Sequence, residues 1–189
     1  MAEREPLEVE SIVLGPPDVS GPLEPWRRLT EEAARVVWSA QTDLGGKVAV
    51  ALMPGQHPTH HSASRVVVGA YSPEARAVLI FIEGVDRVRR TRTYLRQLMR
   101  TLAHEVTHAV QHRLSPNGDT HRRGSVMLSA EKYSDDPLER AAVAEENAFD
   151  HALFSAEPPR DLASKVMAYR GRFTADFVER IHDLESDGN

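Results

Sequence analysis

The stretch that decides the fold is residues 94–112, which read Tyr94-Leu95-Arg96-Gln97-Leu98-Met99-Arg100-Thr101-Leu102-Ala103-His104-Glu105-Val106-Thr107-His108-Ala109-Val110-Gln111-His112. Its apolar residues recur every three or four positions, a period that predicts a helix with one apolar face. That face consists of Leu95, Leu98, Met99, Leu102, Val106 and Val110. His104 and His108 fall close to the opposite side, with Glu105 on a flank. One face can therefore pack into a core while the other lines a cleft.

His104 and His108 are four residues apart, so on a helix their imidazoles lie one turn apart on the same face and can reach one metal ion. Glu105 projects beside that position, where its carboxylate can take a proton from water. The pattern H-E-x-x-H is that of zinc peptidases. Five residues also match by chance, and the alternative is two histidines solvated on the polar side of the helix. The strongly apolar opposite face favours the metal-binding interpretation.

Composition limits the number of domains, the side chains that could bind a metal and the partners to expect. The 189 residues suit one domain, and the 41% that are hydrophobic are enough for a core. The absence of cysteine excludes disulfides, thiolate zinc sites and cysteine nucleophiles, which leaves His, Glu and Asp as metal ligands. The net charge of −5 gives no overall attraction to nucleic acid, so no nucleic-acid partner is expected.

The chain shows no targeting or membrane-spanning signal. No apolar run approaches the length of a membrane span. The start, residues 1–6, is acidic and lacks the apolar core of a secretory signal. We therefore expect no membrane partner and a cytoplasmic location, with secretion without a recognisable signal as the alternative.

The remaining pattern predicts an α+β fold. Residues 1–25 are rich in proline and are expected to form an extended N-terminal arm, either disordered or lying along the body of the protein. Residues 26–189 then form a single domain, in which a small three- to four-stranded sheet packs on the helix of residues 94–112 and on a second ligand-bearing helix. The expected strands are residues 47–53, 65–71 and 76–83, the last two forming a hairpin, and the other expected helices are residues 26–40, 138–155, 161–169 and 174–184, with the C-terminal helices falling within 159–186.

Two polar clusters allow more than one interpretation. The first lies before and at the start of the helix of residues 94–112. Six arginines precede or begin that helix: Arg87, Arg89, Arg90, Arg92, Arg96 and Arg100. They form either a solvated face paired with acidic residues or a docking patch for an acidic protein or nucleic acid, although the interleaved aromatics of a single-strand binder are missing. The second cluster is a polar loop with three histidines, His57, His60 and His61. They could bind a second metal, one of them could contact substrate, or all three are simply solvated.

A catalytic zinc site normally takes three protein ligands, so the two histidines need a third. In one large peptidase group it is the last histidine of H-E-x-x-H-x-x-G-x-x-H, and here Gln111 and Leu114 replace that glycine and histidine, which excludes the group. In the other group a glutamate comes from a downstream helix. Glu139 fits, in the first turn of the predicted second helix. The alternatives that stay open are Glu146, Glu145 and His121.

The residues around these ligands resemble those of one family. They are Leu102-Ala103-His104-Glu105-Val106-Thr107-His108-Ala109-Val110-Gln111, then Tyr133, then Pro137-Leu138-Glu139-Arg140-Ala141-Ala142. They resemble the minigluzincin-type metallopeptidases, small single-domain gluzincins in which a Pro-x-Glu-x-x-Ala helix follows the H-E-x-x-H helix. The resemblance covers residues 45–155. It implies a zincin-like fold in which His104, His108 and Glu139 bind Zn²⁺ and Glu105 is the general base.

The function implied by this resemblance is that of a zinc-dependent metalloendopeptidase acting on a protein or peptide substrate. Glu105 is expected to take a proton from the attacking water and pass it to the leaving amine. Tyr133 and His121, in the loop between the ligand helices, are candidate donors to the oxyanion, and a Tyr133 packed in the core is the alternative. The substrate backbone is expected to pair with an edge strand, residues 47–53 or 65–71. A terminal segment, such as the arm, is expected to hold the enzyme latent or to be a plain tail.

A different class of function stays open beside this one. The chain is then a non-hydrolytic zinc-binding module, regulatory or protein-binding, that keeps the metal for stability. A structural zinc site has all its coordination positions filled and has no use for a general base, so Glu105 distinguishes the two classes.

Overall fold

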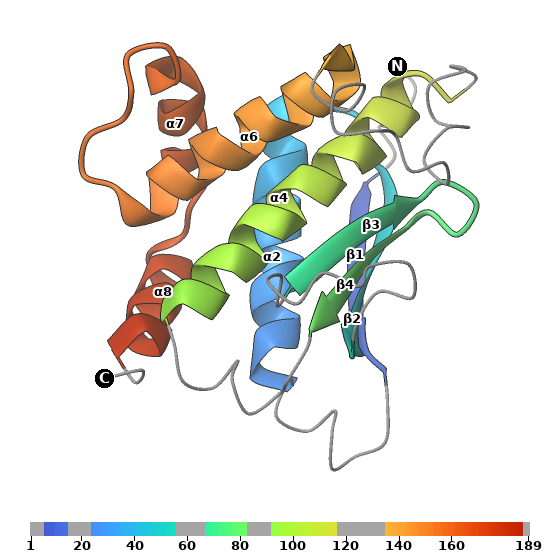
Figure 1. Ribbon diagram of the computed structural model, residues 1–189, viewed down its shortest axis with the longest axis horizontal. Coiled ribbons are helices and arrows are strands. Elements are labelled where there is room, and N and C mark those ends of the chain that lie inside the picture. Colours follow the sequence, from blue (N-terminus) through green and yellow to red (C-terminus); the bar gives the residue numbers. More distant parts are fainter. Residues whose placement is uncertain (1–5, 15–23, 56–66, 83–91, 117–134, 187–189) are drawn as a thin grey trace.

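The computed structural model describes residues 6–14, 24–55, 67–82, 92–116 and 135–186 (Figure 1). These residues form an α+β fold with a four-stranded mixed sheet and five helices, as predicted. The strands are β1 (Leu7–Val13), β2 (Gly46–Pro54), β3 (Val67–Ser72) and β4 (Ala77–Ile82), and the helices are α2 (Glu24–Gln41), α4 (Arg92–Leu114), α6 (Pro137–Phe154), α7 (Ala163–Arg170) and α8 (Ala175–Ser186).

The sheet has the strand order β1-β2-β4-β3. β1 and β4 both run parallel to β2, and β3 pairs antiparallel with β4 as the predicted hairpin. β2 therefore lies inside the sheet, with both sides of its backbone engaged by neighbouring strands. The prediction that residues 47–53 form an edge strand beside a cleft is wrong for this reason. Among the described strands, β3 is the edge on the side of the hairpin.

The strand β1 lies within residues 1–25, which the sequence predicts to be an extended arm before the domain, either disordered or lying along the body of the protein. Val9 and Ser11 of β1 are buried and pair in register with β2, so the domain begins before residue 26. The alternation is hard to recognise because a polar residue, Ser11, occupies the buried face. Its hydroxyl lies 2.8 Å from the carbonyl oxygen of Arg27, and its backbone N–H donates to Glu31 Oε1 at 3.1 Å. Contacts with α2 therefore compensate the burial of this serine.

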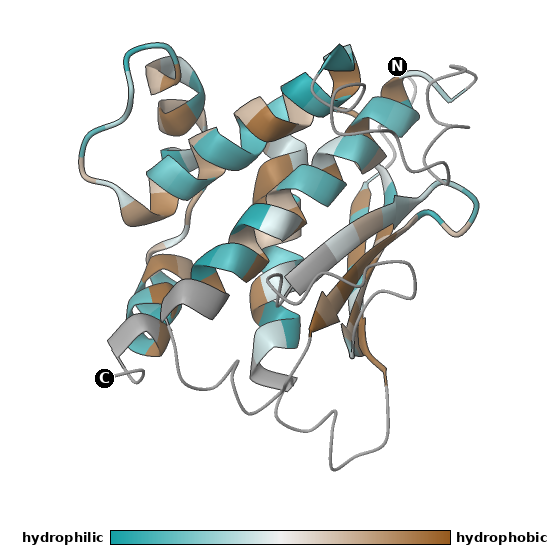
Figure 2. Cartoon of the chain, viewed as in Figure 1, coloured by the Kyte–Doolittle hydropathy of each residue, from teal (hydrophilic) through white to brown (hydrophobic). Residues whose placement is uncertain are grey.

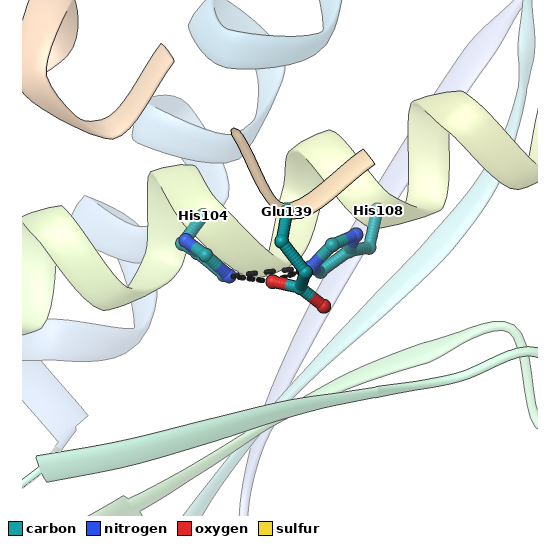
Figure 3. Close-up of side chains that lie close together, drawn as sticks. All are labelled: His104, His108 and Glu139. Carbon is teal, nitrogen blue, oxygen red and sulfur yellow. Dashed lines mark hydrogen bonds and ion pairs between the residues drawn. The ribbon is translucent and has the colours of Figure 1, made fainter. Parts of the chain in front are cut away.

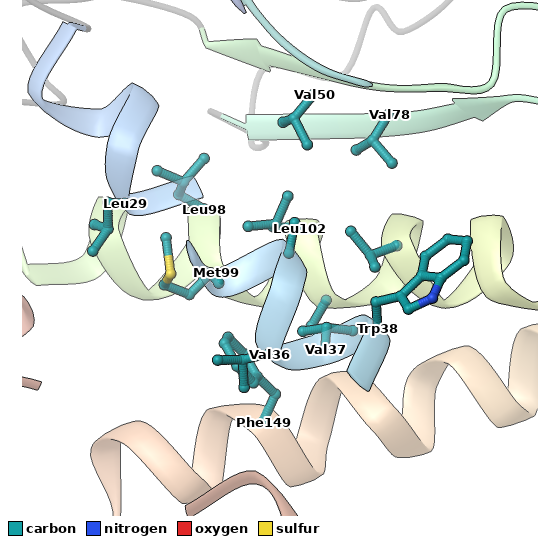
Figure 4. Packing of buried hydrophobic residues seen from close by; sticks show 14 of the residues in the cluster. Leu29, Val36, Val37, Trp38, Val50, Val78, Leu98, Met99, Leu102 and Phe149 are labelled. Carbon is teal, nitrogen blue, oxygen red and sulfur yellow. The ribbon is translucent and has the colours of Figure 1, made fainter. Parts of the chain in front are cut away.

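The helices cover one face of the sheet, and the core lies between them and the strands (Figure 1). In Figure 4, Val50 and Val78 of the sheet face Leu102 of α4, while Val37 of α2 and Phe149 of α6 close the cluster from the other side. All six residues of the predicted apolar face of α4 are buried. At about 1.5–3 kcal/mol for each large aliphatic side chain removed from water, this face is what anchors α4.

The hydropathy of the elements matches their places in the fold (Figure 2). β2 and β4 are predominantly apolar, whereas β1 and the helices include both apolar and polar residues along their length. In the part of the chain that the structure describes, no helix is both long and apolar enough to cross a membrane.

Candidate metal centre

Three side chains from two helices converge beside α4 (Figure 3). His104 and His108 come from α4, and Glu139 comes from the first turn of α6. The two Nε2 atoms are 3.2 Å apart, and Glu139 Oε2 lies 3.3 Å from Nε2 of His104 and 3.4 Å from Nε2 of His108. The three atoms thus form a nearly equilateral triangle at the surface of α4.

The size of this triangle fits a tetrahedral zinc ion. With ligand bonds of about 2.0–2.1 Å, two ligands of a tetrahedral ion are separated by about 3.3–3.4 Å. The three measured separations, 3.2, 3.3 and 3.4 Å, agree with that value. Three protein ligands leave a fourth position for water or substrate, as in catalytic zinc sites.

The hydrogen bonds on the far side of each imidazole orient the nitrogens for a cation. His104 Nδ1 lies 3.2 Å from Glu146 Oε2, and His108 Nδ1 lies 2.9 Å from Gln111 Oε1. Carboxylate and amide oxygens only accept, so each imidazole, when neutral, carries its proton on Nδ1 and turns the lone pair of Nε2 toward Glu139. Two imidazole lone pairs and a carboxylate oxygen, about 3.3 Å apart, repel one another unless a cation lies among them. The donor set therefore fits Zn²⁺.

Protons on the imidazoles can also relieve the repulsion among these three atoms. Burial lowers the pKa of His104, but hydrogen bonds with Glu139 and Glu146 outweigh it and raise the pKa to about 10. Burial also lowers the pKa of His108, but its hydrogen bond with Glu139 and the negative charges of Glu105 and Glu139 together outweigh burial and raise that pKa. A divalent cation at this position would compete with protons, as is usual for imidazole ligands.

The three candidate glutamates of α6 have different surroundings. Glu139 reaches the Nε2 atoms, whereas Glu146 accepts from His104 Nδ1 and from Arg100 Nε, the latter at 2.7 Å. Glu145 points to the opposite side of α6, where it accepts from the Tyr169 hydroxyl at 2.7 Å and forms an ion pair with Lys165. Of these three glutamates only Glu139 reaches the Nε2 atoms, while Glu146 contacts Nδ1 of His104, the position that an outer-sphere carboxylate takes behind a histidine ligand.

The position of Glu139 follows from how α6 begins and packs. Asp136 caps the helix by accepting from the Leu138 backbone N–H at 2.8 Å, and Pro137 occupies the first turn. α6 then runs antiparallel to α4, so that the start of α6 meets the end of α4 near Gln111 and its later turns meet the earlier turns of α4. Glu139 therefore lies level with His104 and His108.

Two of the arginines of the basic cluster join α4 to α6. Arg96 forms a bidentate ion pair with the buried carboxylate of Asp150, at 2.6 and 2.5 Å, and Arg100 pairs with Glu146. This agrees with the interpretation that the arginines pair with acidic residues elsewhere. It also explains cations in the first half of α4, where the helix dipole alone disfavours them.

Gln111 has a role at the site that was not predicted from the sequence. Its amide oxygen accepts from His108 Nδ1, and its amide nitrogen donates to the Leu138 carbonyl at 3.0 Å. One side chain thus orients His108 and holds the turn of α6 that carries Glu139. The spacing of three residues from His108 on the same helix is the sequence signal that points to it.

Glu105 lies between α4 and the edge strand β3. It is buried, and the Tyr71 backbone N–H of β3 hydrogen-bonds to its carboxylate. Burial raises the pKa of Glu105, and the neighbouring His104 and His108 only partly oppose that shift. A carboxylate with a raised pKa, held beside the candidate metal position, has the properties of a general base.

Gly69 allows this close approach of β3 to α4. A Cβ atom at residue 69 would lie 2.5 Å from Glu105 Cγ and 2.5 Å from Thr101 Cγ2. Sequence reasoning missed this role, because a lone glycine within a predicted strand indicates close approach without naming the neighbour.

We expect Gly69→Ala to destabilise the protein by about 1–3 kcal/mol, the usual cost of forcing extra atoms into a packed interior. The substitution should also move β3 away from Glu105, which would lower any activity that depends on that carboxylate. Urea denaturation measures the first effect. Ala70→Ser, one residue along on the other face of β3, is the matched control and should change stability by less than about 1 kcal/mol. Equal stability of the two variants would contradict the close contact.

Several predicted site residues lie outside the described residues. These are the candidate oxyanion donors and the loop histidines, Tyr133, His121, His57, His60 and His61. Their roles stay predictions.

Comparisons of the chain with protein-family models, with curated proteins and with solved structures returned no match. The resemblance to minigluzincin-type peptidases therefore stays a prediction, and the chemistry of the site is argued from its own geometry.

Proposed function

We propose that this protein is a zinc-dependent metalloendopeptidase with a zincin-like fold, acting on a protein or peptide substrate. The observation that carries the proposal is the triangle formed by His104 Nε2, His108 Nε2 and Glu139 Oε2, with edges of 3.2–3.4 Å. A second support is the buried Glu105 beside it, since a purely structural zinc site has no use for a general base.

The residues of the site divide the work of hydrolysis among them. Zinc bound by the two histidines and Glu139 would lower the pKa of a water molecule and polarise the scissile carbonyl. Glu105 takes the proton of the attacking water and passes it to the leaving amine. Glu146, held by Arg100, and Gln111 keep the ligand imidazoles in the required tautomer and orientation.

An extended substrate would align with β3, which is the edge strand next to α4 among the described residues. Backbone hydrogen bonds to an edge strand bind a peptide irrespective of its side chains and hold it straight. β1 lies at the other edge of the sheet, with β2 and β4 between it and β3. Residues 7–13 of the N-terminal arm are thus placed away from this edge, and a latency role for them receives no support.

Metal removal and reconstitution test the proposal. The purified protein should hold about one zinc per chain and cleave an unfolded protein such as casein at internal bonds. Treatment with 1,10-phenanthroline should abolish cleavage, and one equivalent of Zn²⁺ should restore it, whereas Mg²⁺ should not, because it prefers octahedral oxygen ligands. A zinc-loaded protein that cleaves no peptide would contradict the peptidase proposal and favour a non-hydrolytic zinc module.

A further inference from the structure

A tyrosine–histidine pair spans the junction between β3 and α4. The Tyr71 hydroxyl lies 2.8 Å from His112 Nδ1, and the ring centroids are 5.8 Å apart. Neither residue is a candidate metal ligand or general base. Both residues are half-buried, and the proposed hydrolysis assigns no role to either side chain.

The pair stands beside the candidate catalytic groups. His112 follows His108 by four residues, so the two lie one helical turn apart on the same face, at an axial separation of about 6 Å. Tyr71 is two residues from Gly69 on the same face of β3, and its own backbone N–H holds Glu105. Its hydroxyl therefore reaches α4 at His112, one helical turn beyond His108, while its backbone contacts Glu105.

The Tyr71 hydroxyl can donate a hydrogen bond while it accepts one from His112. A phenol accepts and donates at once, so it can accept from His112 Nδ1–H and still donate its own proton. Burial raises the pKa of Tyr71 to about 12, so the phenol keeps its proton at neutral pH. Hydrolysis needs such a donor, because the electron pair of the carbonyl π bond moves to oxygen as water attacks the carbon.

We propose that Tyr71, positioned by His112, donates the hydrogen bond that stabilises the oxyanion of the tetrahedral intermediate. This role rests on the proposed peptidase function. It assigns the oxyanion donor to the edge strand, whereas the sequence pointed to His121 or Tyr133 in the segment between the ligand helices.

The test compares Tyr71→Phe with wild type in the zinc-loaded, full-length protein. Loss of one oxyanion donor typically lowers kcat by about 10²–10³-fold, so we expect a kcat about 10²-fold lower with KM within about twofold. The dissociation constant of a phosphinic peptide, which mimics the tetrahedral intermediate, should rise by the same factor in calorimetry. Zinc affinity and melting temperature should stay close to wild type, because the ring is retained.

Two further variants separate donation from packing. Ser72→Ala removes a hydroxyl from the same strand on the opposite face and should change neither kcat nor phosphinic-peptide affinity. His112→Ala should lower both by about 10-fold, and His112→Asn, which can still donate from near the Nδ1 position, should recover part of the loss.

The outcomes distinguish this inference from the proposed function. If wild type hydrolyses peptides and Tyr71→Phe leaves kcat and phosphinic-peptide affinity unchanged, the donor role is overturned and the peptidase proposal stands. A fall in melting temperature with both values intact has the same meaning, since it shows only a packing role. If zinc-loaded wild type neither hydrolyses peptides nor binds the phosphinic peptide, the proposed function and the donor role fail together.

Discussion

Glu105→Gln is expected to lower peptide hydrolysis by about 10³–10⁴-fold, the upper part of the range for loss of a general base, while about one zinc per chain stays bound. The amide cannot take the proton of the attacking water. Zinc is retained because Glu105 is not one of the three converging ligands. Cleavage rates and metal content, measured on the same preparation, check both halves of this result.

The fold of Glu105→Gln should be preserved, so the loss of activity can be assigned to chemistry. Gln has nearly the same volume as Glu, which matters beside Gly69, and its amide oxygen can still accept from the Tyr71 N–H. Burial raises the pKa of Glu105, so near neutral pH the ionised carboxylate costs folding free energy that a neutral side chain does not. The metal-free variant should therefore melt at a temperature no lower than wild type.

Two results would contradict the role of Glu105. A variant that hydrolyses at the wild-type rate means that another group is the base. A wild type that binds zinc and hydrolyses nothing, with Glu105→Gln indistinguishable from it, points to the non-hydrolytic zinc module.

Glu139→Ala is expected to cause the largest loss of zinc affinity among the glutamates of α6. It removes one of three ligands, and two imidazoles one helical turn apart do not hold zinc tightly by themselves. Titration with a competing chelator should show a loss clearly above the ~10–100-fold typical of outer-sphere residues, and hydrolysis should disappear with the metal.

Glu146→Ala and Glu145→Ala are the matched controls on the same helix. Glu146→Ala should weaken zinc binding by about 10–100-fold, because His104 loses the acceptor on Nδ1 that orients it. Glu145→Ala should leave zinc affinity unchanged and lower only stability, because its partners are Lys165 and Tyr169. A greater loss of zinc from Glu146→Ala than from Glu139→Ala would reverse the assignment of the third ligand.

Much of the fold was predictable because its signals are local. The apolar period of residues 94–112 predicts α4 and its buried face, and the runs on either side of residues 72–75 predict the hairpin of β3 and β4. The strand β1 was not predicted, because its buried face includes Ser11, whose polar atoms are compensated by partners on α2. The partners of a buried polar residue come from distant segments, which no local pattern contains.

The site residues, too, fall into those that local spacing predicts and those that only the packing of helices decides. By itself the sequence determined that His104 and His108 share a helix face with Glu105 beside them, because a spacing of four residues has one geometric meaning on a helix. Glu139 and Glu146 also share a face, seven residues and about 10 Å apart, so spacing could not choose between them. Tertiary structure decides, because the antiparallel packing of α6 on α4 sets which turn of one helix stands level with which turn of the other.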